Sequence, residues 1–407
     1  MRSAGVVVEY NPFHNGHNYH IQETKRKSQA DVIIAVMSGN FLQRGEPALV
    51  SKWSRTKMAL KAGADIIIEL PYAFAVQKAE TFAYGSVFLL NALKCNTICF
   101  GSERGDLLPF IRTLHFLEQH KEDYDDWIHS YMKEGLSYPT AASNAYKRLD
   151  PPDDLIDLSK PNNILGFHYL SAAANINKQI EFITINRQNA DYHDEDFQHA
   201  TIASATAIRK SLQQHSSLDK VRSFMPDTTY SELATYKTAY GQFHDWENYW
   251  PYLQYQLLTI DADELRTIYE VEEGIENRLI KAARQAESFL AFMQMIKTKR
   301  YTWTRLQRLC THILCNCKKS DINKIGKNPS YIRLLGMSEA GRIYLNQVKK
   351  DLPIPLIAKV SAFPKELLQL DLKAANVYTL GLSEPERSKL FKLEFEQPPI
   401  YFDSAKQ

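Results

Sequence analysis

Short apolar runs alternate with amphipathic stretches through the first half of the chain. The apolar runs predict strands at 6–8, 31–37, 66–70, 96–100 and 181–185. Helical spacing between them predicts helices that run to residue 28, over 51–62, over 79–93, through most of 105–158 and over 161–174. This alternation predicts an α/β fold with a Rossmann-like, doubly wound parallel sheet. Ligands bind such a sheet beyond the carboxyl ends of its strands.

The second half of the chain has a different pattern. Residues 213–250 are rich in Ser, Thr, Tyr and Gln, and most of the remaining chain has helical spacing. A chain of 407 residues is also too long for one small core. We therefore expect two domains, a sheet domain over 1–225 and a mainly α-helical C-terminal domain over 226–407.

Composition and charge limit the kinds of partner and the compartment that we expect for this protein. Hydrophobic residues make up 44% of the chain and charged residues 24%, as in ordinary globular proteins. The net charge is only +2, so a nucleic-acid partner needs a local basic patch. The chain starts without a basic and then apolar leader, and no apolar stretch approaches the ~18 residues that cross a bilayer. These features predict a cytoplasmic protein with no membrane partner, and they leave the oligomeric state open.

The five cysteines predict no metal site. Their number is odd and they form no C-x-x-C pair, which argues against a disulfide framework and against a zinc ribbon. Cys310, His312, Cys315 and Cys317 are close in sequence, but their spacing fits no standard metal site. We expect buried thiols on a helix instead.

Residues 4–17 combine a strand, a chain break at Pro12 and the start of a polar-faced helix. The N-terminus of a helix offers unpaired N–H groups and the positive end of a dipole, both of which suit a phosphate. Gly16 would let that phosphate approach the backbone closely. His14 and His17, three residues apart, can both donate to a bound triphosphate. The alternative is a surface loop that happens to carry two histidines.

A second candidate segment runs from Ser204 to Arg209. Ser204 is expected to cap a helix on which Thr206 and Arg209 lie one turn apart on the same face. A hydroxyl and a guanidinium on that face suit the β- and γ-phosphates of a nucleotide. The same pattern, S-x-T-x-x-R, also fits an ordinary capped amphipathic helix.

Two further stretches carry candidate polar ligands. The loop 38–47 is long and polar for a strand-to-helix connection, as functional loops often are. Its Arg44 would hold a carboxylate or a phosphate, or else lie solvated on the surface. Asn162 follows Pro161 at a predicted helix start, where its amide would bond a ribose or a base, or simply cap the helix.

The range 297–333 holds ten basic residues and a single acidic one, Asp321. The candidate RNA-binding residues in it are Lys297, Lys299, Arg300, Arg305 and Arg308, with Tyr301 and Trp303 interleaved. Basic and aromatic side chains together bind a phosphate backbone and stack splayed bases. The alternative is a solvated helical face.

These segments resemble known motifs. His14-x-Gly16-His17 after a strand resembles the H-x-G-H motif of the HIGH nucleotidyltransferase superfamily, and the segment 204–209 resembles its I-S-S-T-x-x-R motif. Two motifs in the right order are stronger evidence than either alone. The segments 9–17, 38–47, 162–166 and 204–209 together resemble the bacterial tRNA(Met) cytidine acetate ligase family, and the similarity extends through 299–302 and 334–336.

The resemblance implies a two-step reaction. Acetate attacks the α-phosphate of ATP, which gives acetyl-adenylate and pyrophosphate, and N4 of the wobble cytidine of elongator tRNA(Met) then takes the acetyl group. Acetate is a ready nucleophile, so catalysis of the first step is mainly placement and charge neutralisation. The implied catalytic residues are His14, His17, Thr206 and Arg209. The implied ATP-binding residues are Val7, Val8, Glu9, Tyr10, Asn11, Pro12, Phe13, His14, Asn15, Gly16, His17, Gly101, Asn162, Arg187 and Ser204. Mg²⁺ is expected with ATP, although no carboxylate cluster marks a protein site for it.

Two other functions share part of this pattern. A small-molecule adenylyltransferase of coenzyme biosynthesis would carry both motifs, but such enzymes are commonly under ~200 residues, about one domain. The long basic second half therefore argues against it. A non-catalytic RNA-binding scaffold would not need the four intact residues of the two motifs.

Overall fold

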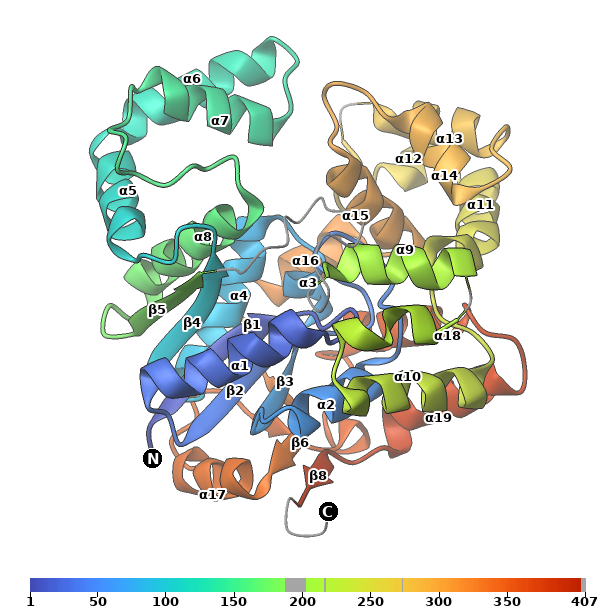
Figure 1. Cartoon of the computed structure of the whole chain (residues 1–407). Helices are drawn as coiled ribbons and strands as arrows, with labels where there is room; N and C mark the ends of the chain where they lie inside the picture. The colour runs from blue at the N-terminus through green and yellow to red at the C-terminus, as the bar shows by residue number, and fades with distance from the viewer. Residues whose placement is uncertain (187–202, 216, 273, 404–407) are drawn as a thin grey trace.

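The chain folds around a large sheet (Figure 1). The structure is a computed structural model that describes residues 1–186, 203–215, 217–272 and 274–403. Within these ranges the strands are β1 (Ser3–Val8), β2 (Val32–Ser38), β3 (Ile66–Leu70), β4 (Thr97–Ser102), β5 (Glu181–Asn186), β6 (Ile332–Ser338), β7 (Leu356–Ile357) and β8 (Ile400–Phe402). Their order in the sheet is β5-β4-β1-β2-β3-β6-β7, and β8 pairs with β6.

Helices cover both faces of this sheet. Helices α1 (Asn15–Ser28) and α2 (Lys52–Lys61) lie on the face turned to the viewer in Figure 1, and α4 (Ala79–Ala92) and α8 (Pro161–Ile176) lie behind it. Strand β2 is buried along its whole length, with alternate side chains packed toward the two helical layers. A strand covered on both faces is a continuous apolar run in sequence, which is why β2 was predictable.

The other helices lie beyond the two layers or around the edges of the sheet. They are α3 (Tyr72–Ala75), α5 (Leu108–Gln119), α6 (Lys121–Lys133), α7 (Tyr138–Arg148), α9 (Ala205–His215), α10 (Asp227–Tyr240), α11 (Trp250–Thr259), α12 (Ala262–Leu265), α13 (Ile275–Ala283), α14 (Phe289–Ile296), α15 (Trp303–Leu314), α16 (Lys319–Ile325), α17 (Glu339–Val348), α18 (Gln369–Thr379) and α19 (Glu386–Glu396). Helices α5–α7 form one projecting lobe and α11–α15 form a second, on the same side of the sheet (Figure 1).

The predicted α/β fold is confirmed. The five strands expected in the first half are all present, and β1 pairs in parallel with β2 and β4, as β2 does with β3 and β4 with β5. The carboxyl ends of these parallel strands therefore meet at one edge of the sheet, where a ligand site is expected.

The second half of the chain extends the same sheet. Strand β6 pairs antiparallel with β3, so the sheet as a whole is mixed. No strand was predicted at 332–338, because a short apolar run in a helical region carries no local signal of its sheet partner. The sheet thus includes residues from both sides of position 225, and the division into domains at that position stays a prediction.

A buried cluster of charges joins the two halves. The Lys52 ammonium on α2 lies 2.8 Å from the Glu69 carboxylate on β3 and 2.9 Å from the Glu394 carboxylate on α19. The Arg333 guanidinium on β6 lies 3.2 Å from Glu69 and 2.5 Å from Glu394. All four side chains are at least 95% buried. Each buried charge is therefore paired, as burial in a medium of low dielectric requires.

The five cysteines are free and buried, which confirms the predicted burial of Cys310, Cys315 and Cys317, although only Cys310 lies within a helix. Burial raises the pKa of Cys95 to about 12 and that of Cys99 to about 11, so both stay protonated at neutral pH. Among the described residues, no group of three or more His, Cys, Asp or Glu side chains is placed to hold a metal ion. No described helix is both long enough and apolar enough to cross a membrane.

Candidate active site

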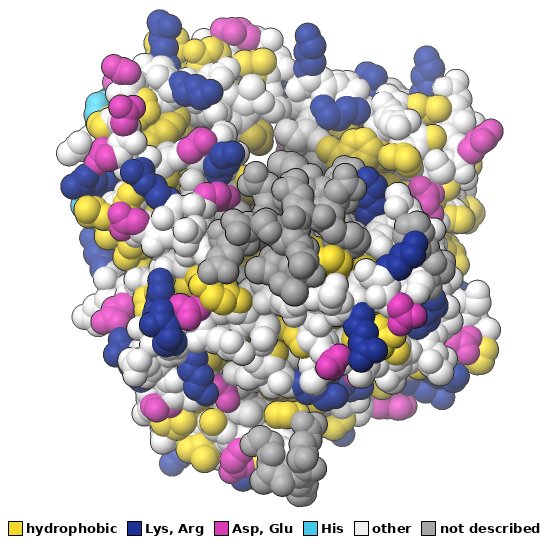
Figure 2. Space-filling view, viewed as in Figure 1, with side chains coloured by type: hydrophobic (Ala, Val, Ile, Leu, Met, Phe, Trp, Pro, Cys, Tyr) yellow, Lys and Arg dark blue, Asp and Glu magenta, His cyan; other side chains and the backbone are white. Residues whose placement is uncertain are grey.

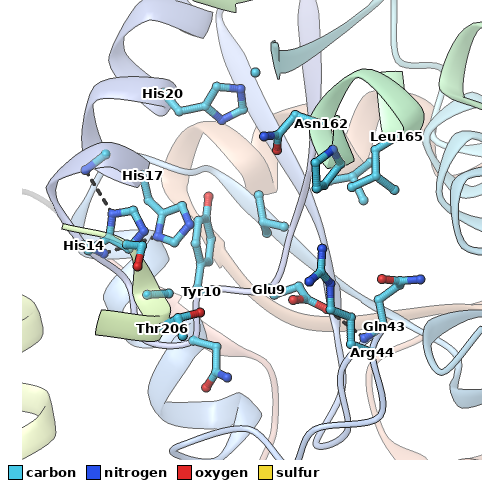
Figure 3. A pocket seen from close by; sticks show the side chains of 18 of the residues that line it. Glu9, Tyr10, His14, His17, His20, Gln43, Arg44, Asn162, Leu165 and Thr206 are labelled. Carbon is cyan, nitrogen blue, oxygen red and sulfur yellow. Dashed lines mark hydrogen bonds between the residues drawn. The ribbon is translucent and has the colours of Figure 1, made fainter. Parts of the chain in front are cut away.

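A cavity of about 280 Å³ opens beyond the carboxyl ends of β1, β4 and β5 (Figure 3). Its lining residues include Val7, Val8, Glu9, Tyr10, Asn11, His14, Gly16, His17, Tyr19, His20, Gln43, Arg44, Glu46, Phe82, Gly101, Pro161, Asn162, Leu165, Tyr169, Ile185, Asn186, Ser204, Thr206 and Arg209. Both motif segments, nearly two hundred residues apart, thus line one cavity. A fold that brings both segments to one cavity favours a nucleotide site over two unrelated surface features.

The two histidines shape the start of helix α1. His14 is the N-cap residue, and its Nδ1 accepts the Gly16 N–H at 3.1 Å. Nδ1 of His17 accepts the His14 N–H at 3.3 Å, and the two rings stack with their centroids 3.7 Å apart. Because each Nδ1 is an acceptor, the proton of each neutral ring is on Nε2. Both imidazoles are therefore hydrogen-bond donors through Nε2, at the positive end of the helix dipole.

A side chain larger than glycine at position 16 would displace the ring of His14. A Cβ built there would lie 2.9 Å from Cε1 of His14. Gly16 therefore lets the ring of His14 pack against the backbone of the first helical turn. The N–H groups of this turn are the ones predicted to bind a phosphate.

Helix α9 brings the second motif to the same place. Ser204 accepts the Ala207 N–H at 3.0 Å through its hydroxyl oxygen, so the predicted cap is confirmed. The Arg209 guanidinium donates to the Asn11 carbonyl oxygen at 2.9 Å and to the Glu46 carboxylate at 2.9 Å. One side chain thus connects α9, the segment after β1 and the loop after β2.

Tyr10 has a buried hydroxyl that no described residue bonds. Its backbone has φ of 51°, in the left-handed region that a tyrosine rarely adopts. The ring packs against His17 and Phe13, with centroids 5.0 and 4.7 Å away. Figure 3 shows the hydroxyl pointing into the cavity between His17 and Asn162. An unpaired buried hydroxyl at a cavity wall marks a place where a ligand can bond.

Glu9 lies next to Tyr10 in the wall of the cavity, with its side chain partly buried. Its Oε1 accepts the Gln43 N–H at 2.7 Å. Desolvation by burial, together with the nearby Glu46 carboxylate, raises the pKa of this carboxyl above its usual value. The Gln43 hydrogen bond and the charges of Arg44 and Arg209 lower that pKa by less.

Arg55 on α2 bonds the backbone of Glu9 and of the end of β2. Its guanidinium is fully buried and donates to the carbonyl oxygens of Glu9 at 2.8 Å and of Ser38 at 3.0 Å, and it also bonds the Gly39 carbonyl. Burial lowers its pKa to about 10, which keeps the guanidinium charged at neutral pH. Arg55 therefore fixes the ends of β1 and β2 relative to each other.

The other predicted residues fall into three groups. Gly101 and Asn162 line the cavity, and the Asn162 amide donates to Glu103 at 2.7 Å. The N-cap of α8 is Lys160, so the alternative that Asn162 caps this helix is wrong. The predicted ATP-binding residues Pro12, Phe13 and Asn15 are not among the cavity's lining residues, and Arg187 lies outside the described residues.

The cavity also includes residues that sequence reasoning did not assign. Gln43 and Glu46 belong to the loop that was expected to carry function, but only the neighbouring Arg44 was named from it, and Arg44 lines the cavity too. His20 lies one helical turn beyond His17, a spacing that could have identified it. Tyr169 had no local signal, since an aromatic residue within a helix is usually part of the core.

Helix α15 contacts the loop 38–47 and forms hydrogen bonds to its backbone. The Thr311 hydroxyl donates to the Gly45 carbonyl oxygen at 2.7 Å, and the Gln307 amide donates to the Arg44 carbonyl oxygen at 3.1 Å. Gly45 has φ of 80°, and a Cβ there would meet the Arg308 backbone at 2.6 Å. The basic segment of the second half is thus in direct contact with a wall of the cavity.

The five basic residues predicted to bind RNA differ in exposure. Lys297, Lys299 and Arg300 are exposed, whereas Arg305 stacks on Tyr301 with its guanidinium carbon 4.8 Å from the ring centroid. Arg308 is buried, and its guanidinium donates to Glu270 at 2.9 Å. Basic and acidic side chains are interspersed over the face in Figure 2, which agrees with the low net charge. The RNA-binding role of these five residues stays a prediction.

Comparisons with known proteins agree with this geometry. The sequence profile described as HIGH Nucleotidyl Transferase matches residues 1–391. The chain belongs to the HIGH nucleotidyl transferase family. Within this family, a tRNA(Met) cytidine acetate ligase of Geobacillus sp. is 53% identical over 98% of this chain and 100% of its own length. The protein of the same name from Bacillus subtilis is 47% identical over 100% of this chain and 99% of its own.

Two solved structures resemble the whole fold. The apo crystal structure of Thermotoga maritima TmcAL has a TM-score of 0.91 and 34% identity, and covers 99% of this chain and 100% of that one. A second structure of TmcAL, bound with alpha-thio ATP, has a TM-score of 0.90 and 33% identity with the same coverage. A family member with this fold therefore binds an ATP analogue, and the family resemblance seen in the sequence is confirmed.

Proposed function

We propose that this protein is a tRNA(Met) cytidine acetate ligase. It activates acetate with ATP to acetyl-adenylate, releases pyrophosphate, and transfers the acetyl group to N4 of the wobble cytidine of elongator tRNA(Met). One observation supports this most directly: His14, His17, Thr206 and Arg209 line one cavity at the edge of the sheet. Relatives that are about half identical over nearly the whole chain carry this name, so neither rival function is favoured.

The residues that line the cavity support a mechanism for the first step. A carboxylate oxygen of acetate attacks the α-phosphorus of ATP, and the bond to the β-phosphate oxygen breaks. The departing pyrophosphate gains negative charge, and donors that already point at it lower the barrier without having to reorganise. His14 and His17 would donate through Nε2 to phosphate oxygens, and Arg209 with Thr206 would hold the pyrophosphate end.

Mg²⁺ belongs to this proposal only as a companion of ATP. The residues that the structure describes provide no group of carboxylates, histidines or thiols that could hold a metal ion. We propose that phosphate oxygens and water ligate Mg²⁺, and we assign no step of the reaction to it.

The tRNA is proposed to reach the cavity along the lobe of α11–α15. The exposed Lys297, Lys299 and Arg300 lie between α14 and α15, and α15 contacts the cavity loop. Binding through phosphates would weaken steeply with salt. A tRNA substrate also places the enzyme in the cytoplasm.

The proposal is tested by isotope exchange and by product mapping. Purified protein with ATP and acetate should exchange labelled pyrophosphate into ATP. With labelled acetate and total tRNA, the label should appear in N4-acetylcytidine when the nucleosides are resolved by mass spectrometry. Exchange without any labelled nucleoside would favour the small-molecule adenylyltransferase, and nucleotide binding without exchange would favour the scaffold.

A further inference from the structure

The two steps of the proposed reaction make different chemical demands on the cavity. Acetate already carries the charge with which it attacks, and no proton is released in that step. N4 of cytidine is a neutral amine whose electron pair is shared with the ring, and it must lose a proton as it becomes an amide. The second step therefore needs a base and the first does not.

The cavity contains few groups that can act as this base. His14 and His17 already use Nδ1 to accept backbone N–H groups, so their Nε2 atoms are donors. The Glu46 carboxylate lies 2.9 Å from the Arg209 guanidinium, and a carboxylate held in such a pair is a weak base.

Glu9 differs from the two histidines and from Glu46 in its hydrogen bonds and ion pairs. One of its oxygens accepts the Gln43 N–H at 2.7 Å, and among the described residues it forms no ion pair. Its backbone is fixed by the buried Arg55, which donates to the Glu9 carbonyl at 2.8 Å. Figure 3 shows the carboxylate between Tyr10 and Arg44, at the cavity. The second oxygen thus remains available, and burial makes it more basic than an exposed carboxylate.

We infer that Glu9 is the general base of acetyl transfer, a role that rests on the proposed function. The N4 electron pair forms a bond to the acetyl carbonyl carbon, and the bond from that carbon to the adenylate oxygen breaks. AMP leaves with that electron pair. The N4 proton passes to the second oxygen of Glu9 and from there to water. The charge of Glu9 is restored for the next turnover.

Hydroxylamine separates this role from ATP binding. It is a nucleophile strong enough to attack acetyl-adenylate without a base, and it forms acetohydroxamate. Wild type and Glu9→Gln are assayed with ATP and acetate, once with hydroxylamine and once with tRNA. Glutamine keeps the size of the side chain but cannot take a proton. We expect the ratio of tRNA acetylation to hydroxamate formation to fall about 10²–10⁴-fold in the variant.

Matched variants test the assignment. Glu46→Gln alters the other carboxylate of the cavity and should change both rates together, so its ratio should stay near that of wild type. His20→Gln should also keep the wild-type ratio. Filter binding should give the same tRNA affinity for wild type and Glu9→Gln, because Glu9 lies in the cavity wall and not on the outer surface.

The possible outcomes are distinct. A parallel loss of both products in Glu9→Gln overturns the inference and indicates a role in adenylation. A selective loss of tRNA acetylation in His20→Gln, with Glu9→Gln like wild type, assigns the base to His20 instead. If wild type itself forms no hydroxamate, the proposed function fails, and the role of Glu9 fails with it.

Discussion

Two buried regions of this molecule differ in whether their polar side chains have hydrogen-bond partners. Away from the lining of the cavity, the buried hydroxyls of Tyr236 and Tyr249 bond the two ring nitrogens of His244 at 2.8 and 2.6 Å. In the cavity wall the Tyr10 hydroxyl is just as buried, yet no described residue bonds it. Leaving a buried hydroxyl unpaired costs about 1–3 kcal/mol. Pairing within the protein therefore indicates a role in stability, and an unpaired group at a cavity indicates a role in binding a ligand.

The charged groups show the same contrast. The cluster of Lys52, Glu69, Arg333 and Glu394 is closed, and every member has a partner of opposite charge. Among the described residues, the Glu9 carboxylate has a single hydrogen bond, which the Gln43 backbone N–H donates. Substitutions in the closed regions should act on stability, and substitutions in the cavity should act on the reaction.

The largest effect is expected for the closed charge cluster. Lys52→Met should lower the free energy of unfolding by about 3–5 kcal/mol, because the nearby carboxylates lose a buried partner. Lys57→Met is the matched control, since the half-exposed Lys57 lies 3.4 Å from Glu232 and should change stability by less than about 1 kcal/mol. Urea unfolding measures both. Equal effects of the two substitutions would contradict the contrast between closed and open regions.

The substitution His17→Ala tests whether the cavity carries out the reaction with ATP. Removing one donor to the leaving pyrophosphate should slow acetate-dependent ATP–pyrophosphate exchange about 10²–10³-fold. Its effect on unfolding should be small compared with that of Lys52→Met. The exposed His129→Gln on α6 serves as control and should exchange like wild type. Normal exchange in His17→Ala would remove the assigned role.

Three histidines whose pKa is lowered by burial predict how stability depends on pH. Burial lowers the pKa of His244 and His312 to about 3 and that of His168 to about 4, below the ordinary 6.5. As pH falls below 6.5 the unfolded chain binds protons that the folded chain does not, so stability decreases. The raised pKa values of Asp371, about 6, and of Glu9 act in the opposite direction.

For these five groups together, the unfolded chain therefore binds about one to two protons more than the folded chain between pH 6 and pH 5. The free energy of unfolding should fall by about 1.4–2.7 kcal/mol across this unit of pH. Urea unfolding at the two pH values measures this change. Stability that is constant or increases on acidification would show that the buried histidines are not held neutral.

The smallest effects come from a pair of hydroxyl deletions. Tyr236→Phe should lower the free energy of unfolding by about 1–2 kcal/mol, because Nε2 of His244 loses its partner, and should leave exchange unchanged. Tyr10→Phe should leave stability unchanged or raise it by about 1 kcal/mol, and should slow exchange about tenfold. Thermal unfolding and exchange kinetics measure the two quantities. Loss of stability in Tyr10→Phe would show that its hydroxyl has a partner in the protein.

Much of the sheet and part of the site could be predicted from sequence. The parallel strands are continuous apolar runs because both faces are covered, and the cap at Ser204 forms through a hydrogen bond to a residue three positions away. Glu46 was not assigned, because its partner Arg209 is 163 positions away.

The sequence alone determined the features that depend on neighbouring residues: the strands of the first half, the start of α1 with its two histidines, and the cap of α9. The tertiary structure decided the features that depend on distant residues. It placed β6 beside β3, paired the buried charges around Lys52, and left the Tyr10 hydroxyl and one Glu9 oxygen at the cavity without a hydrogen-bond partner among the described residues. The physical reason is that hydrogen bonding and burial of a side chain are set by the groups that surround it in space, and a sequence pattern shows only the groups nearby in the chain.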